Sequence, residues 1–151
     1  MSLVDKIEEK YKISIKEKDN NSINTLRLIK SSIKDKEIAL RSKQEKLLDK
    51  DILSLLQNMI KQRKDSIEAF AKANRNDLIE KEKNEVLVIE KFLPQQLSEG
   101  EAQKIIAKII QENNLSSLKD MGKLMSIIKT NYVGQIDMGV AGKIAKSSLG
   151  N

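Results

Sequence analysis

Apolar residues recur every three or four positions along most of the chain, which is the pattern of amphipathic helices. Four such segments occupy the first 93 residues. The pattern predicts helices that end near residue 18, run from about 22 to 40, run from 49 or 51 to 73, and run from 78 to 93. The first helix is marked by an apolar repeat at three and four residues, made of Val4, Ile7, Tyr11 and Ile15.

Turn and loop signals separate these helices. The segment 19–22 is predicted to be a turn that caps the second helix, and the charged stretch 41–50 is predicted to be a loop or a frayed helix end. Asn74 suits a left-handed helix stop. Pro94 is predicted to end the fourth helix, because the residue before a proline is disfavoured in the helical conformation.

Three shorter amphipathic segments follow Pro94. Each begins at a capping signal, namely Ser98 with Glu101 in a capping box, Ser117 with Asp120, and Asp137. No segment has the alternation expected of a strand. The sequence therefore predicts an all-α fold with an N-terminal bundle of about four helices at 1–93 and a small three-helix unit at 94–151.

The composition limits which catalytic and metal-binding groups the chain can offer. The chain has 151 residues, no cysteine and no histidine. It therefore lacks a thiolate nucleophile, an imidazole acid or base, and a Cys/His zinc site. No phosphate-binding glycine motif occurs, and the spaced carboxylates and paired serines match no hydrolase pattern. We expect no catalytic residue, no metal and no cofactor.

The expected location of the protein follows from similar arguments. No apolar run approaches the roughly 20 residues that a membrane span needs. The N-terminal residues carry acids where a signal peptide needs a basic and then an apolar segment. Together with the lack of cysteine, these features predict a cytosolic protein with no membrane association.

Positive charge gathers in one part of the chain. The net charge is +6, and the segment 27–64 holds eleven Lys or Arg against five Asp or Glu. Within it, a stripe on the second helix falls within about 60° at 100° per residue, and consists of Arg27, Lys30, Lys34 and Arg41. This stripe is typical of a phosphate-backbone contact, whereas the alternative is a solvated helix face with internal charge pairs.

The next helix offers a possible extension of that footprint. Lys61 and Arg63 lie in a polar stretch of the third helix and could prolong the nucleic-acid contact. The alternative is an internal network of ion pairs between the third and fourth helices, with partners among Lys81, Glu82, Glu85 and Glu90. The sequence leaves the two interpretations open.

Two glycines mark the C-terminal unit as a docking surface. Gly122 and Gly139 lie in the first turns of predicted helices, where a neighbouring backbone can approach and N-terminal amides can meet an anion. The pair Gly122-Lys123 adds a cation at that place. The alternative is close packing of helices inside the unit.

Taken in order, six segments of the sequence resemble the YqeY family, free-standing relatives of the tail domain of the GatB subunit of the glutamine-dependent aspartyl/glutamyl-tRNA amidotransferase. They span nearly the whole chain and are Thr25–Leu28, Met59–Ile67, Ala73–Leu78 with Lys81-Glu82, Leu93–Ser98, Asp120–Met125, and Gly134 with Asp137–Gly139. The resemblance implies the same all-helical, two-part architecture.

The resemblance also implies a function. The GatB tail is understood to engage the body of tRNA, so the expected partner is tRNA or a complex that charges tRNA. The residues expected to face tRNA by this similarity are Gly122, Lys123, Lys129, Gly134 and Lys143. A carbon–nitrogen ligase label with glutamine as amido donor attaches to the family through the shared domain, and we interpret it as inherited.

Three hypotheses follow from the resemblance. The first is a tRNA-binding accessory protein without catalysis of its own. The second is an interaction module that docks on an amidotransferase or an aminoacyl-tRNA synthetase. The third is participation in amide transfer as a loosely bound subunit.

Overall fold

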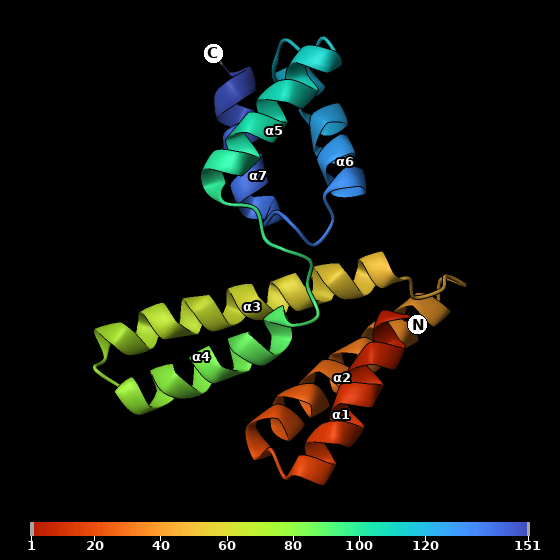
Figure 1. Ribbon diagram of the computed structural model, residues 1–151. Coiled ribbons are helices and arrows are strands. Elements are labelled where there is room, and N and C mark those ends of the chain that lie inside the picture. The colour runs from red at the N-terminus through yellow and green to blue at the C-terminus, as the bar shows by residue number, and fades with distance from the viewer. Residues whose placement is uncertain (1, 151) are drawn as a thin grey trace. The chain divides into compact units, whose positions relative to one another are not determined.

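The computed structural model describes residues 2–150 and confirms the all-α prediction. Within this range the chain forms seven α-helices and one short 3₁₀ helix, without a strand (Figure 1). The chain divides into two compact units, Met1–Leu93 and Pro94–Asn151. We call them unit 1 and unit 2 and describe each by itself. Among the described residues, no helix is long and apolar enough to cross a membrane.

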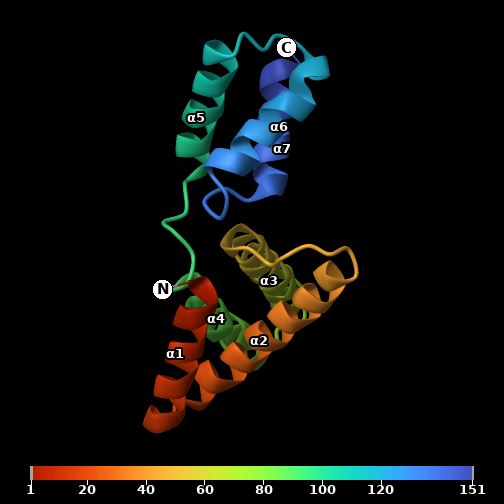
Figure 2. The ribbon, with the colours of Figure 1, turned by 90° about the vertical axis from the view of Figure 1, so that its right-hand side faces the viewer.

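Unit 1 is built from two helical hairpins. The first hairpin pairs α1 with α2 and the second pairs α3 with α4, as Figures 1 and 2 show. Their bounds are Leu3–Glu17, Asn20–Arg41, Asp49–Lys72 and Asn76–Glu90. One apolar core joins the hairpins and includes Ile7, Leu26, Ile29, Ile52, Leu56 and Ile89. No residue from 61 to 84 is fully buried, so the distal parts of α3 and α4 lie outside this core.

Helix α1 buries only part of the face that its apolar repeat marks, namely Ile7 and, partly, Tyr11. Leu3, Ile7 and Ser14 are its buried residues, whereas Val4 and Ile15 are 42% and 48% exposed. Both faces fit a helical period, because Val4 and Ile15 lie only about 60–80° from Ile7 at 100° per residue. The contact with α2 decides between them, and it places the small Ser14 side chain inside.

Two helix boundaries also differ from the prediction. α2 begins at Asn20 rather than near Ser22, because the Asp19 carboxylate caps it and accepts hydrogen bonds from the Ser22 N–H at 3.2 Å and from the Ser22 hydroxyl at 2.6 Å. α4 ends at Glu90, three residues before Leu93. Asn74 has the expected left-handed backbone, with φ of 56°.

Unit 2 packs three helices around a second core. They are α5 (Glu99–Glu112), α6 (Met121–Asn131) and α7 (Met138–Leu149), and the 3₁₀ helix η1 (Leu118–Asp120) leads into α6. The core includes Ile106, Leu124, Ile128, Ala141 and Ala145. Ser98 caps α5 by accepting from the Glu101 N–H at 3.2 Å, but its hydroxyl, not its N–H, donates to the Glu101 carboxylate at 3.1 Å. The predicted capping box is therefore only half formed.

Candidate nucleic-acid interface

Two members of the predicted basic stripe on α2 hold α1 in place. The Arg27 Nε donates to the Tyr11 hydroxyl at 3.2 Å. The Lys30 Nζ lies 3.0 Å from a Glu8 carboxylate oxygen and 4.1 Å from the centroid of the Tyr11 ring. This combines an ion pair with a cation–π contact. Arg27 and Lys30 thus already have partners inside unit 1.

The remaining members of the stripe differ from each other. Arg41 pairs with Glu37 one turn earlier on α2, at 3.4 Å. Lys34 is exposed and has no carboxylate oxygen within 4.0 Å in the described chain. Of the four cations, Lys34 is therefore the one with neither a hydrogen bond nor an ion pair in the described chain.

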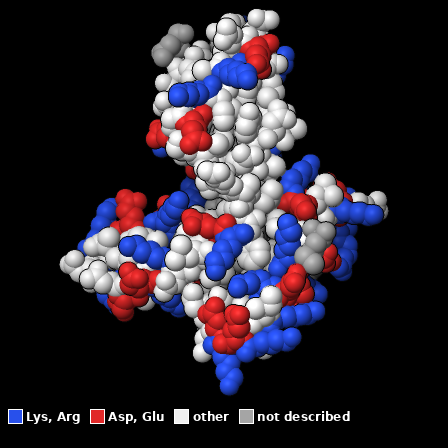
Figure 3. Space-filling view, viewed as in Figure 1, with Lys and Arg blue, Asp and Glu red and all other residues white. Residues whose placement is uncertain are grey.

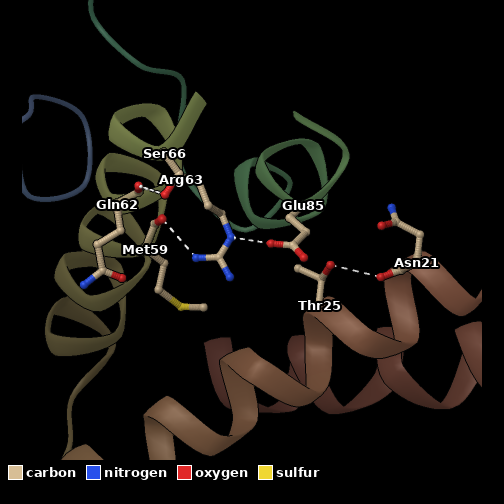
Figure 4. A network of polar contacts seen from close by, with 7 residues as sticks. All are labelled: Asn21, Thr25, Met59, Gln62, Arg63, Ser66 and Glu85. Atoms are coloured by element: carbon tan, nitrogen blue, oxygen red, sulfur yellow. Dashed lines mark hydrogen bonds and ion pairs between the residues drawn. The ribbon is translucent and has the colours of Figure 1, made fainter. Parts of the chain in front are cut away.

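Arg63 points into unit 1, where it meets Glu85 of α4 (Figure 4). Its Nε donates to the Glu85 carboxylate at 2.8 Å, and its Nη1 donates to the Met59 carbonyl at 3.1 Å. The two side chains are only 12% and 11% exposed. The internal ion pair that the sequence left open is the arrangement found, and it takes the Arg63 guanidinium away from the predicted footprint.

A polar residue of α2, Thr25, also faces Glu85 (Figure 4). Thr25 is completely buried, and Figure 4 shows its side chain on the side of α2 that faces Glu85. The Thr25 hydroxyl donates to the Asn21 carbonyl at 2.9 Å, so its polar group is satisfied within its own helix. Lys61, by contrast, is exposed on α3 and has no carboxylate partner in the described chain.

In unit 2, Asp120 organises the backbone that carries the Gly122-Lys123 pair. Its carboxylate accepts hydrogen bonds from the N–H groups of Ser116 and Ser117, at 2.8 and 3.3 Å. These two bonds hold the pKa of Asp120 below its ordinary value, and the charge of Lys123 adds to the effect. Lys123 itself is exposed in the first turn of α6.

The glycines of unit 2 do different things. Gly122 is exposed, and a Cβ added there meets no atom within 4 Å, so packing inside unit 2 does not require a glycine. Gly134 is buried with φ of 80°, a conformation that favours glycine, and its carbonyl accepts a hydrogen bond from the Gln96 side chain. Gly134 therefore shapes the loop between α6 and α7. Gly139 lies in the first turn of α7 and is exposed.

The other two predicted lysines of unit 2 lie on different helices. Lys129 is exposed in the last turn of α6, where its charge suits the carboxyl end of the helix dipole. Lys143 lines an open groove between α5 and α7, together with Glu99, Gln103, Ile144, Ser147 and Ser148. On α6, Lys123 and Lys129 are about 120° apart at 100° per residue, so they do not share one face.

The described residues contain no group of three or more acidic, histidine or cysteine side chains that could hold a metal ion. Among the acids of α4, Glu85 is committed to Arg63. The sequence did not single out Glu85 as the partner of Arg63, because Glu82 and Glu90 on the same helix were equally suitable candidates. The arrangement offers exposed cations on both units.

Comparison with known proteins places this arrangement in a family. A family model described as Yqey-like protein matches residues 4–149. The chain belongs to this family. The resemblance found in the sequence is therefore confirmed over nearly its full length.

Relatives of this Yqey-like chain include proteins from three yeasts. "Altered inheritance of mitochondria protein 41, mitochondrial" of Lachancea thermotolerans is 38% identical over 113 residues, which cover 70% of this chain and 59% of that protein. The protein with the same name in Kluyveromyces lactis is 36% identical, over 80% of this chain and 61% of that protein. An uncharacterized protein of Schizosaccharomyces pombe is 37% identical, over 61% of this chain and 72% of its own length.

The names of these relatives correct the expected location of the protein. The chain spans about 60% of the length of the two mitochondrial proteins. Their names contradict the expected cytosolic location, and that prediction was wrong. The physical reason is that a chain without cysteine and without an apolar span is compatible with several compartments, so neither feature could distinguish among them.

Proposed function

We propose that this Yqey-like protein binds structured RNA, with tRNA as its partner, as an accessory protein without catalysis of its own. The observation that carries the proposal is a set of exposed lysines with no carboxylate oxygen within 4.0 Å in the described chain: Lys34, Lys61, Lys123, Lys129 and Lys143. Free cations of this kind neutralise phosphates and release counterions. The net charge of +6 acts in the same direction.

The character of this binding follows from the same side chains. The chain has two Tyr, two Phe and no Trp, which disfavours recognition by stacking of unpaired bases. Contacts between lysines and phosphates carry no sequence information by themselves. Recognition is therefore expected to follow the shape and charge of folded RNA.

A mobility-shift titration of the purified protein against total tRNA at two salt concentrations tests the proposal. We expect binding that weakens at the higher salt and that weakens further in the variant Lys123→Glu. Lys129→Glu, on the same helix, tests the other flank of α6. If the protein does not shift tRNA even at low salt, RNA binding is wrong.

A second candidate function is docking on an amidotransferase or an aminoacyl-tRNA synthetase through unit 2. It is favoured by Gly122, a solvent-facing helical glycine that packing inside the unit does not require, and by the 52% exposed side chain of Leu118 close by in sequence. An association that persists at high salt and is lost in Gly122→Leu supports it. Amide transfer as a loosely bound subunit requires glutamine-dependent amidation of mischarged tRNA, which an activity assay with the purified amidotransferase tests.

A further inference from the structure

The cations that the sequence places on α2 and α3 differ in their contacts. Lys30, Arg41 and Arg63 pair with Glu8, Glu37 and Glu85, and the Arg27 Nε donates to the uncharged Tyr11 hydroxyl. Among the lysines of unit 1 with no hydrogen bond or ion pair in the described chain, three exposed ones lie on α3, namely Lys50, Lys61 and Lys64. We call these three residues the α3 ridge.

The α3 ridge occupies one side of its helix. At 100° per residue the three lysines fall within about 60° of one another, and at 1.5 Å per residue they span about 21 Å. The buried seam of α3, formed by Leu56 and Ile60, fixes the rotation of the helix and turns the ridge toward solvent. Lys50 lies beside this buried stretch, whereas Lys61 and Lys64 follow its last fully buried residue, Ile60.

No acid interrupts the ridge. The residues between its lysines on the same side are Ser54 and Gln57, both uncharged. The two acids of the first turn of α3 are directed to backbone amides, since Asp49 accepts from the Leu3 N–H at 3.4 Å and Asp51 from the Leu48 N–H at 2.9 Å. Farther along, Asp65 and Glu68 are exposed one turn after Lys61 and Lys64, and Lys72 lies 4.0 Å from Glu68, so the acid-free stretch ends at Lys64.

These observations separate the two basic surfaces of unit 1 by their availability. A phosphate that approaches Lys30 must compete with Glu8 and with the Tyr11 ring, whereas a phosphate that approaches the α3 ridge displaces only water and counterions. In Figure 3, acidic and basic side chains are mixed over the visible face of unit 1, so an acid-free row is a local feature.

We propose that the α3 ridge, and not the α2 stripe, is the surface of unit 1 that contacts the phosphate backbone of RNA. This inference rests on the proposed function and refines it. The ridge contains no aromatic side chain, so it binds a double-stranded segment through its backbone and does not discriminate among sequences. The sequence analysis counted Lys50 and Lys64 among the cations of segment 27–64, but it did not group them with Lys61 on one side of the helix.

Three triple variants with the same change in net charge test this inference. The ridge variant is Lys50→Gln/Lys61→Gln/Lys64→Gln, and the stripe variant is Arg27→Gln/Lys30→Gln/Lys34→Gln. The control variant changes three exposed lysines of α1, Lys6→Gln/Lys12→Gln/Lys16→Gln. Affinity for total tRNA is measured for each full-length protein at four salt concentrations, and far-UV circular dichroism verifies that each variant is folded.

The slope of log K against log salt reports the number of phosphates contacted, at about 0.7–0.9 per contact. We expect the ridge variant to lose about 2 from the slope, and the stripe and control variants to lose less than about 1 each. If the wild type binds and the ridge variant loses no more than the control, the inference is wrong while RNA binding stands. The same holds if the stripe variant loses the most. If the wild type does not bind tRNA, the proposed function and the inference both fail.

Discussion

The buried ion pair of unit 1 allows a quantitative prediction. Glu85→Gln removes the charge that faces Arg63 while nearly preserving the shape of the side chain. With charge centres about 4 Å apart and an effective dielectric constant near 20, the lost attraction is about 4 kcal/mol. Removing one partner of a buried pair costs about 3–5 kcal/mol, because the other charge is left buried.

The local structure moderates that estimate. The side chains retain 12% and 11% exposure, so water reaches the stranded Arg63 guanidinium to some extent. Arg63 also keeps its hydrogen bond to the Met59 carbonyl. We therefore expect Glu85→Gln to lower the free energy of unfolding of unit 1 by about 2–4 kcal/mol.

Urea unfolding followed by circular dichroism measures this change. A chain of two compact units can unfold in two steps, so each transition must be assigned. Leu56→Ala and Leu124→Ala serve as markers, because each removes a fully buried side chain from one core, at a cost of about 2–5 kcal/mol. Glu85→Gln should shift the same transition as Leu56→Ala and leave the other in place.

A double variant separates the ion pair from other effects. Arg63→Met/Glu85→Leu replaces both charges with apolar side chains, so no charge is left buried, and we expect stability within about 1 kcal/mol of wild type. The double variant should also bind tRNA with an unchanged salt slope, since Arg63 does not face solvent. The reasoning is refuted if Glu85→Gln costs less than about 0.5 kcal/mol, or if the double variant is as unstable as the single one.

Three further predictions concern both units. Gly122→Ala should stabilise unit 2 by about 0.5–1 kcal/mol, since the added methyl group meets no atom and alanine favours the helix. Gly134→Ala should destabilise unit 2 by about 1–2 kcal/mol, because Gly134 has a positive φ. Urea unfolding of both variants checks this contrast. Because the pKa of Asp120 is lowered in the folded state, the Asp120 carboxylate stabilises unit 2 above about pH 4, and this stabilisation is lost as the pH falls through the lower folded pKa. In an acid titration, the variant Asp120→Asn should therefore lose less stability than the wild type. Tyr11→Phe should cost unit 1 less than about 1 kcal/mol, because the hydrogen bond from Arg27 is exposed; a loss above 2 kcal/mol in urea unfolding would contradict this.

The fold was accessible from the sequence because its signals are local. Helical periodicity and the left-handed residue Asn74 depend on neighbours within one or two turns, and each is found as predicted. The exceptions are also local in origin. At the start of α2, Asp19 is the cap residue in place of Asn21 or Ser22. At the start of α5, the Glu101 carboxylate accepts from the Ser98 hydroxyl, whereas in a capping box it accepts from the Ser98 backbone N–H.

The candidate site was accessible only in part. The sequence located the positive charge and the Gly122-Lys123 pair, since both are visible as composition and spacing. It could not tell that Lys30 is held by Glu8 and Tyr11, or that Gly134 is a buried turn residue. Those facts depend on which side chains meet across helices.

The sequence by itself thus determined the helices of this Yqey-like chain, its family and its excess of positive charge, because each depends on the identity and order of the residues and not on contacts between helices. Only the tertiary structure decided which face of α1 is buried, that Arg63 pairs with Glu85 from 22 residues away, and which lysines remain free. The physical reason is that an amphipathic helix with a broad apolar side can pack in several rotations of similar energy. The packing of neighbouring helices selects one of them, and with it the partner of every charge.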